Sequence, residues 1–192
     1  MQHSYPQRVT TEELWGEIAP VEHAVQIYAS DEAFLEALDG FVSGGLRAHD
    51  SVIIIATRAH RSALEDRLRA HGFNVELARA EDRYVPLDAE ATLARFMING
   101  WPDEERFRQV VGGLIVRARK RGRRVRAFGE MVALLWQQGQ ADATVRLEQL
   151  WDEFAAEAGF CLLCAYPQSG FTQAARGSLD GICAQHSRVI AG

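Results

Sequence analysis

The sequence predicts an α/β fold of three layers, in which helices cover both faces of a mostly parallel sheet. Short apolar segments alternate along the chain with longer segments whose apolar residues recur at helical spacing. The segment 51–56, SVIIIA, is apolar almost throughout, which is typical of a parallel strand covered on both faces. Strands joined by helices form parallel sheets through right-handed crossovers. A chain of 192 residues is long enough for one such domain with a full core.

The first half of the chain predicts an N-terminal arm, 1–20, followed by the start of a single domain, 21–192. The first long helix is indicated by Phe34, Leu38 and Phe41, which recur on one face, and Gly44-Gly45 is expected to end it. The expected elements are a short helix at 12–18 in the arm, a strand at 23–28, a helix from 31, a strand at 51–56, a helix at 58–71, short strands or extended links at 75–78 and 83–87, and a helix from 88 to about 98.

The second half predicts two further strands and four helices, the last of them short. Phe107, Val111 and Leu114 form the buried stripe of the first of these helices, which ends in a basic cluster at Gly122. The expected elements are a turn at 99–103, a helix from 103, a strand at 125–128, helices at 130–137 and 141–158, a strand at 160–166, and a short helix and tail.

Composition excludes several classes of protein. A formal net charge of −5 argues against general nucleic-acid binding. No apolar run is long enough to span a bilayer, and the first residues have no basic-plus-apolar signal pattern. Three cysteines cannot all pair with one another, and two of them lie in an apolar run. A reduced, cytoplasmic location is therefore expected.

A nucleotide-hydrolysing enzyme with this architecture needs a glycine-rich phosphate loop with Lys and Ser or Thr after its first strand. Here the first strand is followed by Ala29-Ser30-Asp31-Glu32, which contains no glycine and no lysine. Its two carboxylates would repel a triphosphate. The sequence thus predicts a core that lacks a functional phosphate loop.

Glu130 follows a short buried strand and Gly129, at the point where an apolar helix begins. In open α/β sheets ligands bind at such points, so Glu130 is a candidate ligand-binding residue. Alternatively, it only complements the dipole of the helix that it begins. A buried carboxylate needs a partner, for which Arg126, Tyr28 or a ligand are candidates. Tyr28, Trp136 and Tyr166 lie near strand ends or loops and either line a pocket or belong to the core.

A basic run extends from Arg117 to Arg126. It is either a solvated helix end, where cations are favourable, or a surface for an acidic partner. Aromatic residues are not interleaved with it, so direct DNA binding is not expected. The candidate partner-binding residues in the run are Arg121, Arg123 and Arg124.

Cys161, Cys164, Cys183 and His186 together resemble a four-ligand metal set. Residues three apart in a strand point to opposite faces, however, so Cys161 and Cys164 could not share an ion. We therefore predict buried, inert cysteines and neither a metal nor a cofactor.

Taken together, the motifs resemble the MEDS domain, the sensory domain of methanogens, methylotrophs and the dichloromethane-responsive repressor. The resemblance covers residues 22–190, and its most specific blocks are Gly129-Glu130-Met131 and Leu163-Cys164-Ala165-Tyr166-Pro167. Further matching motifs are His23-x-x-Gln26-x-Tyr28, Asp31 with Phe34-Leu35, Gly45-Leu46, Ile55-Ala56-Thr57, His60-Arg61, Leu87-Asp88-Ala89, Gly100-x-Pro102-Asp103, Leu147-Glu148-x-Leu150-Trp151 and Cys183-x-x-His186-Ser187.

The resemblance implies a RecA-like core, similar in plan to clock ATPases of the KaiC type, with a degenerate phosphate loop. It also implies signal sensing, because MEDS domains occur with histidine kinases, DNA-binding repressor domains and anti-sigma-factor modules. This chain carries none of these modules, so we expect it to act on a separate partner or through a homodimer.

The resulting hypothesis is a non-enzymatic sensory domain that binds a small molecule at the carboxyl ends of the strands. The expected ligand-binding residues are Tyr28, Asp31, Asp88, Glu130, Trp136 and Tyr166. Two alternatives stay open at this point: a protein-interaction module without a ligand, which uses the basic run or Trp15, and a residual nucleotide-binding ATPase.

Overall fold

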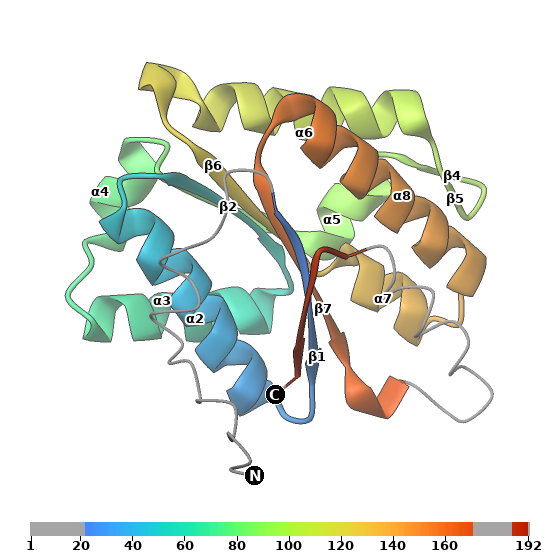
Figure 1. Ribbon diagram of the computed structural model, residues 1–192, viewed down its shortest axis with the longest axis horizontal. Coiled ribbons are helices and arrows are strands. Elements are labelled where there is room, and N and C mark those ends of the chain that lie inside the picture. The colour runs from blue at the N-terminus through green and yellow to red at the C-terminus, as the bar shows by residue number, and fades with distance from the viewer. Residues whose placement is uncertain (1–21, 171–185, 192) are drawn as a thin grey trace, which may run out of the picture.

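The computed structural model describes residues 22–170 and 186–191, and its centre is a parallel sheet (Figure 1). Six strands lie in the order β3-β2-β6-β7-β1-β8, and every neighbouring pair is parallel. The strands are β1 (His23–Tyr28), β2 (Ser51–Ala56), β3 (Tyr84–Asp88), β6 (Val125–Gly129), β7 (Cys161–Pro167) and β8 (Arg188–Ala191).

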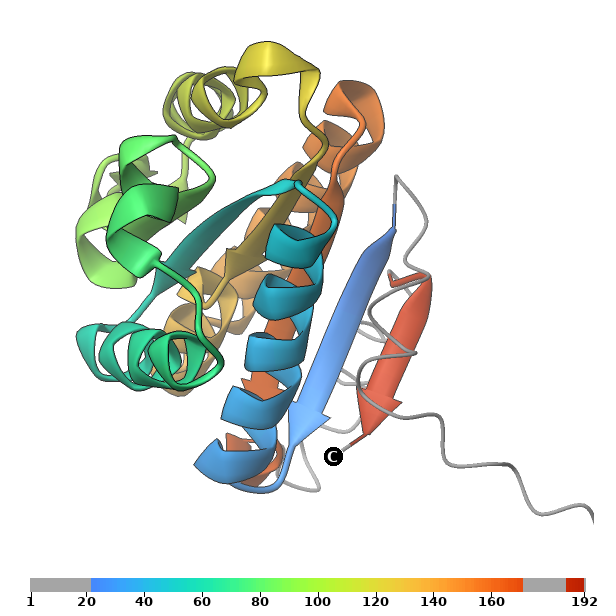
Figure 2. The same cartoon turned by 90° about the vertical axis from the view of Figure 1, so that its left-hand side faces the viewer.

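Helices cover both faces of the sheet, which confirms the predicted three-layer α/β fold (Figure 2). On one face, α2, α3 and α4 pack against Val52, Ile54 and Phe128. On the other face, α5, α6, α7 and α8 pack against Ile53 and Ile55. The helices are α2 (Asp31–Arg47), α3 (Arg58–Ala70), α4 (Val75–Ala80), α5 (Ala89–Ala94), α6 (Glu104–Ala118), α7 (Met131–Gln137) and α8 (Ala141–Ala158), with 3-10 turns η1 (Lys120–Gly122) and η2 (Gln168–Gly170).

The segment SVIIIA behaves as its composition predicts. All six residues of β2 are buried, and successive side chains enter opposite core layers. This strand lies between β3 and β6, so neither its faces nor its edges meet water. Such full burial explains why the segment lacks the apolar–polar alternation of a half-exposed strand.

Four local predictions are wrong. The segment 75–78 is helical, because Asn74 caps α4 by accepting a hydrogen bond from the backbone N–H of Leu77 at 2.9 Å. Gly44-Gly45 does not end α2, which continues to Arg47. The helix predicted to reach 98 ends at Ala94, and the end of the chain, expected to be a tail, contains β8.

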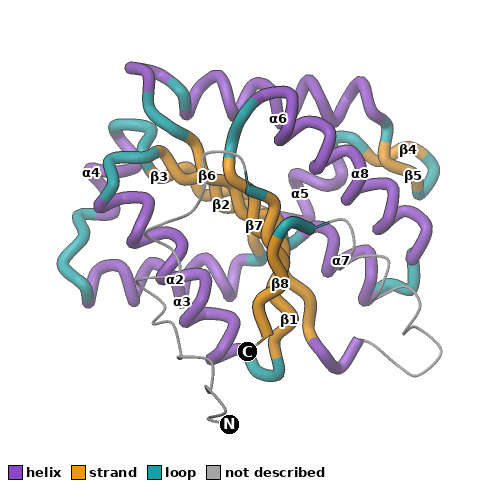
Figure 3. Tube along the Cα trace, in the orientation of Figure 1, coloured by secondary structure: helices purple, strands orange, loops and turns teal. Residues whose placement is uncertain are grey.

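A small hairpin replaces the end of that predicted helix. Strands β4 (Met97–Ile98) and β5 (Trp101–Pro102) pair antiparallel beside α8 and apart from the main sheet (Figure 3). Asn99 and Gly100 connect them with positive φ angles of 51° and 78°. Both residues tolerate this conformation, and Asn-Gly is the preferred pair for a two-residue hairpin turn.

The connection from β1 to α2 consists only of Ala29 and Ser30, and Ser30 caps the helix by accepting a hydrogen bond from the backbone N–H of Ala33 at 3.2 Å.

The predicted arm, 1–20, and its helix at 12–18 lie outside the described residues. No described helix has both the length and the apolar character needed to cross a membrane.

Candidate functional site

The carboxyl ends of the parallel strands meet at one edge of the sheet, and Glu130 lies there. Strand β6 is paired with β2 so that Gly129 lies opposite Ile55. The residues that follow these two strands, Glu130 and Thr57, are therefore neighbours. The backbone N–H of Glu130 donates to the carbonyl of Ile55 at 2.9 Å, which extends the ladder to the edge.

The carboxylate of Glu130 binds the start of α3. Its Oε2 accepts a hydrogen bond from the backbone N–H of Thr57 at 2.8 Å, and its Oε1 lies 2.8 Å from Nδ1 of His60. It makes no capping hydrogen bond to its own helix, α7. The partner is thus His60, rather than Arg126 or Tyr28 as the sequence suggested. Glu130 links the end of β6 to a helix that begins 72 residues earlier, at Arg58 (130 − 58).

Tyr28 and Asp31 belong to the same electrostatic environment. Burial raises the pKa of Tyr28 to about 12, and the negative charges of Glu130 and Asp31 contribute to the increase. The hydrogen bond with Glu130 raises the pKa of His60, although burial opposes the shift. We call Tyr28, Asp31, His60 and Glu130 the Glu130 cluster.

Phe34 forms the apolar floor of the Glu130 cluster. Its ring centroid lies 5.0 Å from that of Tyr28 and 4.6 Å from that of His60. Phe34 is fully buried, whereas Asp31 is exposed and the His60 side chain is 18% exposed. The cluster therefore extends from the core, where Tyr28 and Glu130 are buried, to the surface at Asp31.

Asp88 lies at the same edge but has partners of its own. Its carboxylate caps α5 by accepting from the backbone N–H of Ala91 at 3.0 Å, and it pairs with Arg61 at 3.0 Å. The hydrogen bond from Ala91 is the main cause of its lowered pKa. Arg61 also donates to the carbonyl of Ala56 at 3.2 Å, so it connects Asp88 to the end of β2.

Trp136 and Tyr166 lie on the opposite face of the sheet from Tyr28. Their rings are 6.3 Å apart and nearly perpendicular. The hydroxyl of Tyr166, which is fully buried, donates to Oε1 of Glu148 on α8. The six predicted ligand-binding residues thus form three groups: Tyr28, Asp31 and Glu130 together, Asp88 with Arg61, and the aromatic pair with Glu148.

Sequence reasoning did not assign His60 and Thr57 to the site, although both occur in the motifs quoted above. The available signal was their position: Thr57 directly follows β2, and His60 occupies the first turn of the next helix. A residue there is close to the carboxyl edge of the sheet. Nothing local, however, indicated that β2 and β6 are neighbours.

The basic run is largely paired within the chain. Arg117 and Lys120 bind Asp82, and Arg124 binds Asp50 at 3.1 Å. Arg123 donates to the carbonyl of Glu81 at 2.8 Å. Arg121 is exposed and has a positive φ of 65°. The excess positive charge of this surface is therefore much smaller than the sequence suggests.

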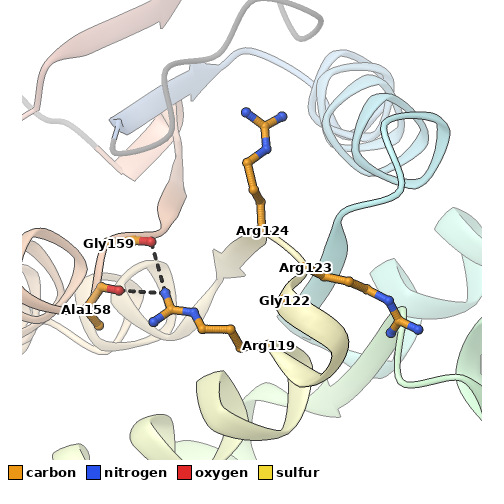
Figure 4. A pocket seen from close by; sticks show the side chains of 6 residues that line it. All are labelled: Arg119, Gly122, Arg123, Arg124, Ala158 and Gly159. Atoms are coloured by element: carbon orange, nitrogen blue, oxygen red, sulfur yellow. Dashed lines mark hydrogen bonds between the residues drawn. The ribbon is translucent and has the colours of Figure 1, made fainter.

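A cavity of about 290 Å³ lies beside this run, at the amino ends of β6 and β7 (Figure 4). Arg119 reaches across it to the carbonyls of Ala158 and Gly159, at 2.6 and 3.0 Å, whereas Arg123 and Arg124 point in other directions. It is lined by Arg119, Gly122, Arg123, Arg124, Ala158 and Gly159. It lies at the opposite end of the strands from the Glu130 cluster.

The two cysteines of β7 point to opposite faces, as predicted. Cys161 lies in the core layer of α2, and Cys164 in the layer of α8. Cys183 lies outside the described residues. His186 and Cys164 meet His23 and Glu148 in a group with potential metal-binding atoms.

Comparison with known proteins gives one family. The family model described as MEDS, "MEthanogen/methylotroph, DcmR Sensory domain", matches residues 22–186. A search of curated proteins finds no match. The matched range includes the whole Glu130 cluster.

Proposed function

The chain belongs to the MEDS family of sensory domains, and from this premise we propose that it is a non-enzymatic sensor whose ligand binds at the Glu130 cluster. The observation that carries the proposal is the double contact of the Glu130 carboxylate with Thr57 and His60 at the carboxyl edge of the sheet. Titratable side chains with shifted pKa values, gathered at such an edge, are typical of binding sites.

The charges of the cluster favour a small neutral or cationic ligand. Asp31 and Glu130 both face this region and both act on the pKa of Tyr28. An anionic ligand would be repelled by two carboxylates, whereas the hydroxyl of Tyr28 and the imidazole of His60 offer hydrogen bonds to a polar group. Phe34 packs against both rings and supports them from the core side.

Helix α3 is the element that we expect to transmit the signal. A ligand that donates a hydrogen bond to the Glu130 carboxylate would release Thr57 or His60, which both lie at the start of α3. That helix is connected to its neighbours through Arg67, which binds Glu32 of α2 at 2.7 Å, and Arg69, which binds Glu76 of α4 at 2.9 Å. A preference of a few kcal/mol for one position of α3 would be enough to change a partner's contact.

A non-enzymatic role is supported by the connection between β1 and α2. It has two residues, neither of them glycine, and the next residues are Asp31 and Glu32. A phosphate cradle needs several backbone N–H groups along a loop. ATP hydrolysis by the purified chain that is lost in Glu130→Ala would nevertheless replace the sensory proposal with the nucleotide-binding alternative.

The direct test is a thermal-shift screen of small metabolites and halogenated one-carbon compounds against three proteins: the wild type, Glu130→Gln and Glu90→Gln. A ligand at about 100 times its dissociation constant stabilises the folded state by about 2.7 kcal/mol. For a chain of this size, that corresponds to an increase in melting temperature of about 5–10 °C. We expect the shift in the wild type and in Glu90→Gln, whose altered residue is exposed, and its loss in Glu130→Gln.

Two results would count against this proposal. If no compound stabilises the wild type, ligand sensing by the isolated chain is not supported. If a compound stabilises the wild type and Glu130→Gln equally, the ligand binds elsewhere.

We propose further that the signal passes to a separate regulator, such as a histidine kinase, an anti-sigma factor or a repressor, or to a second copy of the chain. Besides α3, the basic surface at Arg121, Arg123 and Arg124 is a second candidate for contact with this partner. The cavity beside it supports this choice. Charge reversal at Arg121 and Arg123 should weaken capture of an acidic partner. An unchanged capture would exclude this surface.

A further inference from the structure

A second group of chemically active side chains lies on the other face of the sheet, between the sheet and α8. These residues come from four separate parts of the chain: the start of β1, the middle of α8, the middle of β7, and the residue that precedes β8. One donor atom from each lies within 4.8 Å of the other three. We call this set the donor group: His23, Glu148, Cys164 and His186.

Four of the six separations within the donor group are close to those in a tetrahedral metal shell. Oε2 of Glu148 lies 3.6 Å from Nε2 of His23 and 3.6 Å from Nε2 of His186. Sγ of Cys164 lies 3.5 Å from both Nε2 of His23 and Oε2 of Glu148. Around a tetrahedral zinc ion, with bonds of about 2.0–2.3 Å, neighbouring donor atoms lie roughly 3.3–3.8 Å apart.

Outer partners hold two of these side chains in the orientation that an ion requires. Nδ1 of His23 lies 3.1 Å from Oδ1 of Asp152, which directs Nε2 toward the donor group. The Tyr166 hydroxyl binds Oε1 of Glu148 and leaves Oε2 directed at the histidines. Metal-binding histidines commonly donate their other ring N–H to a carboxylate in this way.

The position of His186 is determined by the residue that follows it. The backbone N–H and the hydroxyl of Ser187 both donate to the carbonyl of His23, at 2.8 and 2.9 Å. The backbone N–H of His23 in turn donates to the Ser187 hydroxyl at 3.1 Å. This reciprocal contact brings the two imidazoles together, with ring centroids 4.0 Å apart.

We propose that the donor group binds one divalent transition-metal ion of the zinc class, with Cys164 as thiolate. A thiolate, two imidazoles and one carboxylate suit zinc and exclude magnesium and calcium, which prefer oxygen ligands alone. The side chains of Glu148 and His186 have no solvent exposure, and four protein ligands leave no open position. The ion is therefore structural: it fastens the segment that begins at His186, and with it β8, to β1, β7 and α8.

This inference is independent of the proposed sensory function, because the donor group and the Glu130 cluster occupy opposite faces of the sheet. The competing explanation for the donor group is a set of carboxylate–imidazole pairs without an ion. Metal content and cobalt spectroscopy distinguish the two.

The first experiment measures bound metal in the full-length chain. Elemental analysis should find one equivalent of zinc or a similar ion, and cobalt(II) added to the metal-free chain should produce a sulfur-to-cobalt charge-transfer band. The double variant Cys161→Ser/Cys183→Ser retains Cys164 as its single thiol, so a band in that variant can come only from Cys164.

Matched variants then test each ligand. Cys164→Ser should abolish the band, and His186→Gln should lower metal affinity at least tenfold. Cys161→Ser is the control, since this buried cysteine lies in the same strand but faces the other layer, and it should keep the band. Asp152→Asn should weaken binding by about 10- to 100-fold, as expected for loss of an outer-shell partner.

Three results would overturn the inference. The first is a wild-type chain that contains no metal and gives no charge-transfer band with cobalt. The second is a band that is absent from the single-thiol variant. The third is metal binding that is unchanged in His186→Gln, which decides the matter even if Cys164→Ser does not fold.

Discussion

At the scale of single residues, the best-defined feature of the carboxyl edge is the pair formed by Glu130 and His60. Both are mostly buried, with side chains 7% and 18% exposed. A buried carboxylate without a partner would be costly, and Glu130 instead accepts hydrogen bonds from a backbone N–H and an imidazole. The pair therefore contributes stability that depends on the protonation of His60.

The sign of that dependence follows from the direction of the shift. The hydrogen bond with Glu130 raises the pKa of His60 above its ordinary value of 6.5. Folding thus favours protonated His60. The stabilisation by this pair is complete below pH 6.5 and disappears as the pH rises through the raised pKa. As the pH rises through this range, we expect the free energy of unfolding of the wild type to fall by on the order of 1 kcal/mol relative to that of His60→Gln.

Urea denaturation of both proteins across this pH range is the measurement. His49→Asn is the control, because His49 is exposed and asparagine tolerates its positive φ of 60°. A stability difference between the wild type and His60→Gln that is the same at every pH would contradict the prediction.

At the scale of elements, two helical glycines differ in the space around them. Helix α2 packs tightly against the sheet at Gly45, whereas α6 has open space at Gly113. A Cβ atom at Gly45, in α2, would lie 2.9 Å from Cδ of Arg126 and 2.9 Å from Cγ2 of Val52. A Cβ atom at Gly113, in α6, would have no neighbour within 4 Å. Gly45 therefore permits close contact between α2 and the sheet, rather than ending the helix.

These two positions predict opposite effects of the same substitution. Gly45→Ala should destabilise the protein by about 1–3 kcal/mol, because the overlap outweighs the better helix propensity of alanine. Gly113→Ala should stabilise it by about 0.5–1 kcal/mol. Free energies of unfolding from urea titrations test both, and equal effects at the two sites would show that α2 can move away from β2 and β6.

At the scale of the whole molecule, the last strand, β8, is the outermost strand of the sheet and covers its neighbour β1. Strand β8 pairs with β1 from Ala24 to Ile27, and Arg188 binds Glu22 at 2.7 Å. Without β8, the largely buried β1 would become an unpaired edge. Exposed strand edges promote association between chains.

A chain that ends at Ser187 removes β8 and keeps all four residues of the donor group. We expect the free energy of unfolding to fall by about 2–4 kcal/mol, because each lost hydrogen bond has a net value of about 0.5–1.5 kcal/mol. We also expect the truncated chain to self-associate. Thermal denaturation and light scattering measure the two effects. Val189→Ser is the control, since Val189 is 48% exposed and its replacement retains the strand. A truncated chain that stays monomeric and equally stable would show that β8 is dispensable.

The local errors of the sequence prediction have specific causes. The segment 75–78 was short and apolar enough to suit a strand, and the cap at Asn74 decided for a helix. Residues 188–191, RVIA, are mostly apolar but too few to predict a strand, and β8 is an edge strand defined by its pairing with β1. In both cases the decisive interaction was a hydrogen bond, which periodicity does not record.

The sequence by itself determined the layered α/β fold, the apolar strands and the family, because apolar spacing along a chain reports which side of each element is buried. It also placed Glu130 at the end of a strand. Only the tertiary structure decided which side chains meet. The strand order β3-β2-β6-β7-β1-β8 brings Glu130 to His60 and His186 to Cys164, since contacts between distant segments depend on which strands are neighbours. No local pattern encodes that order.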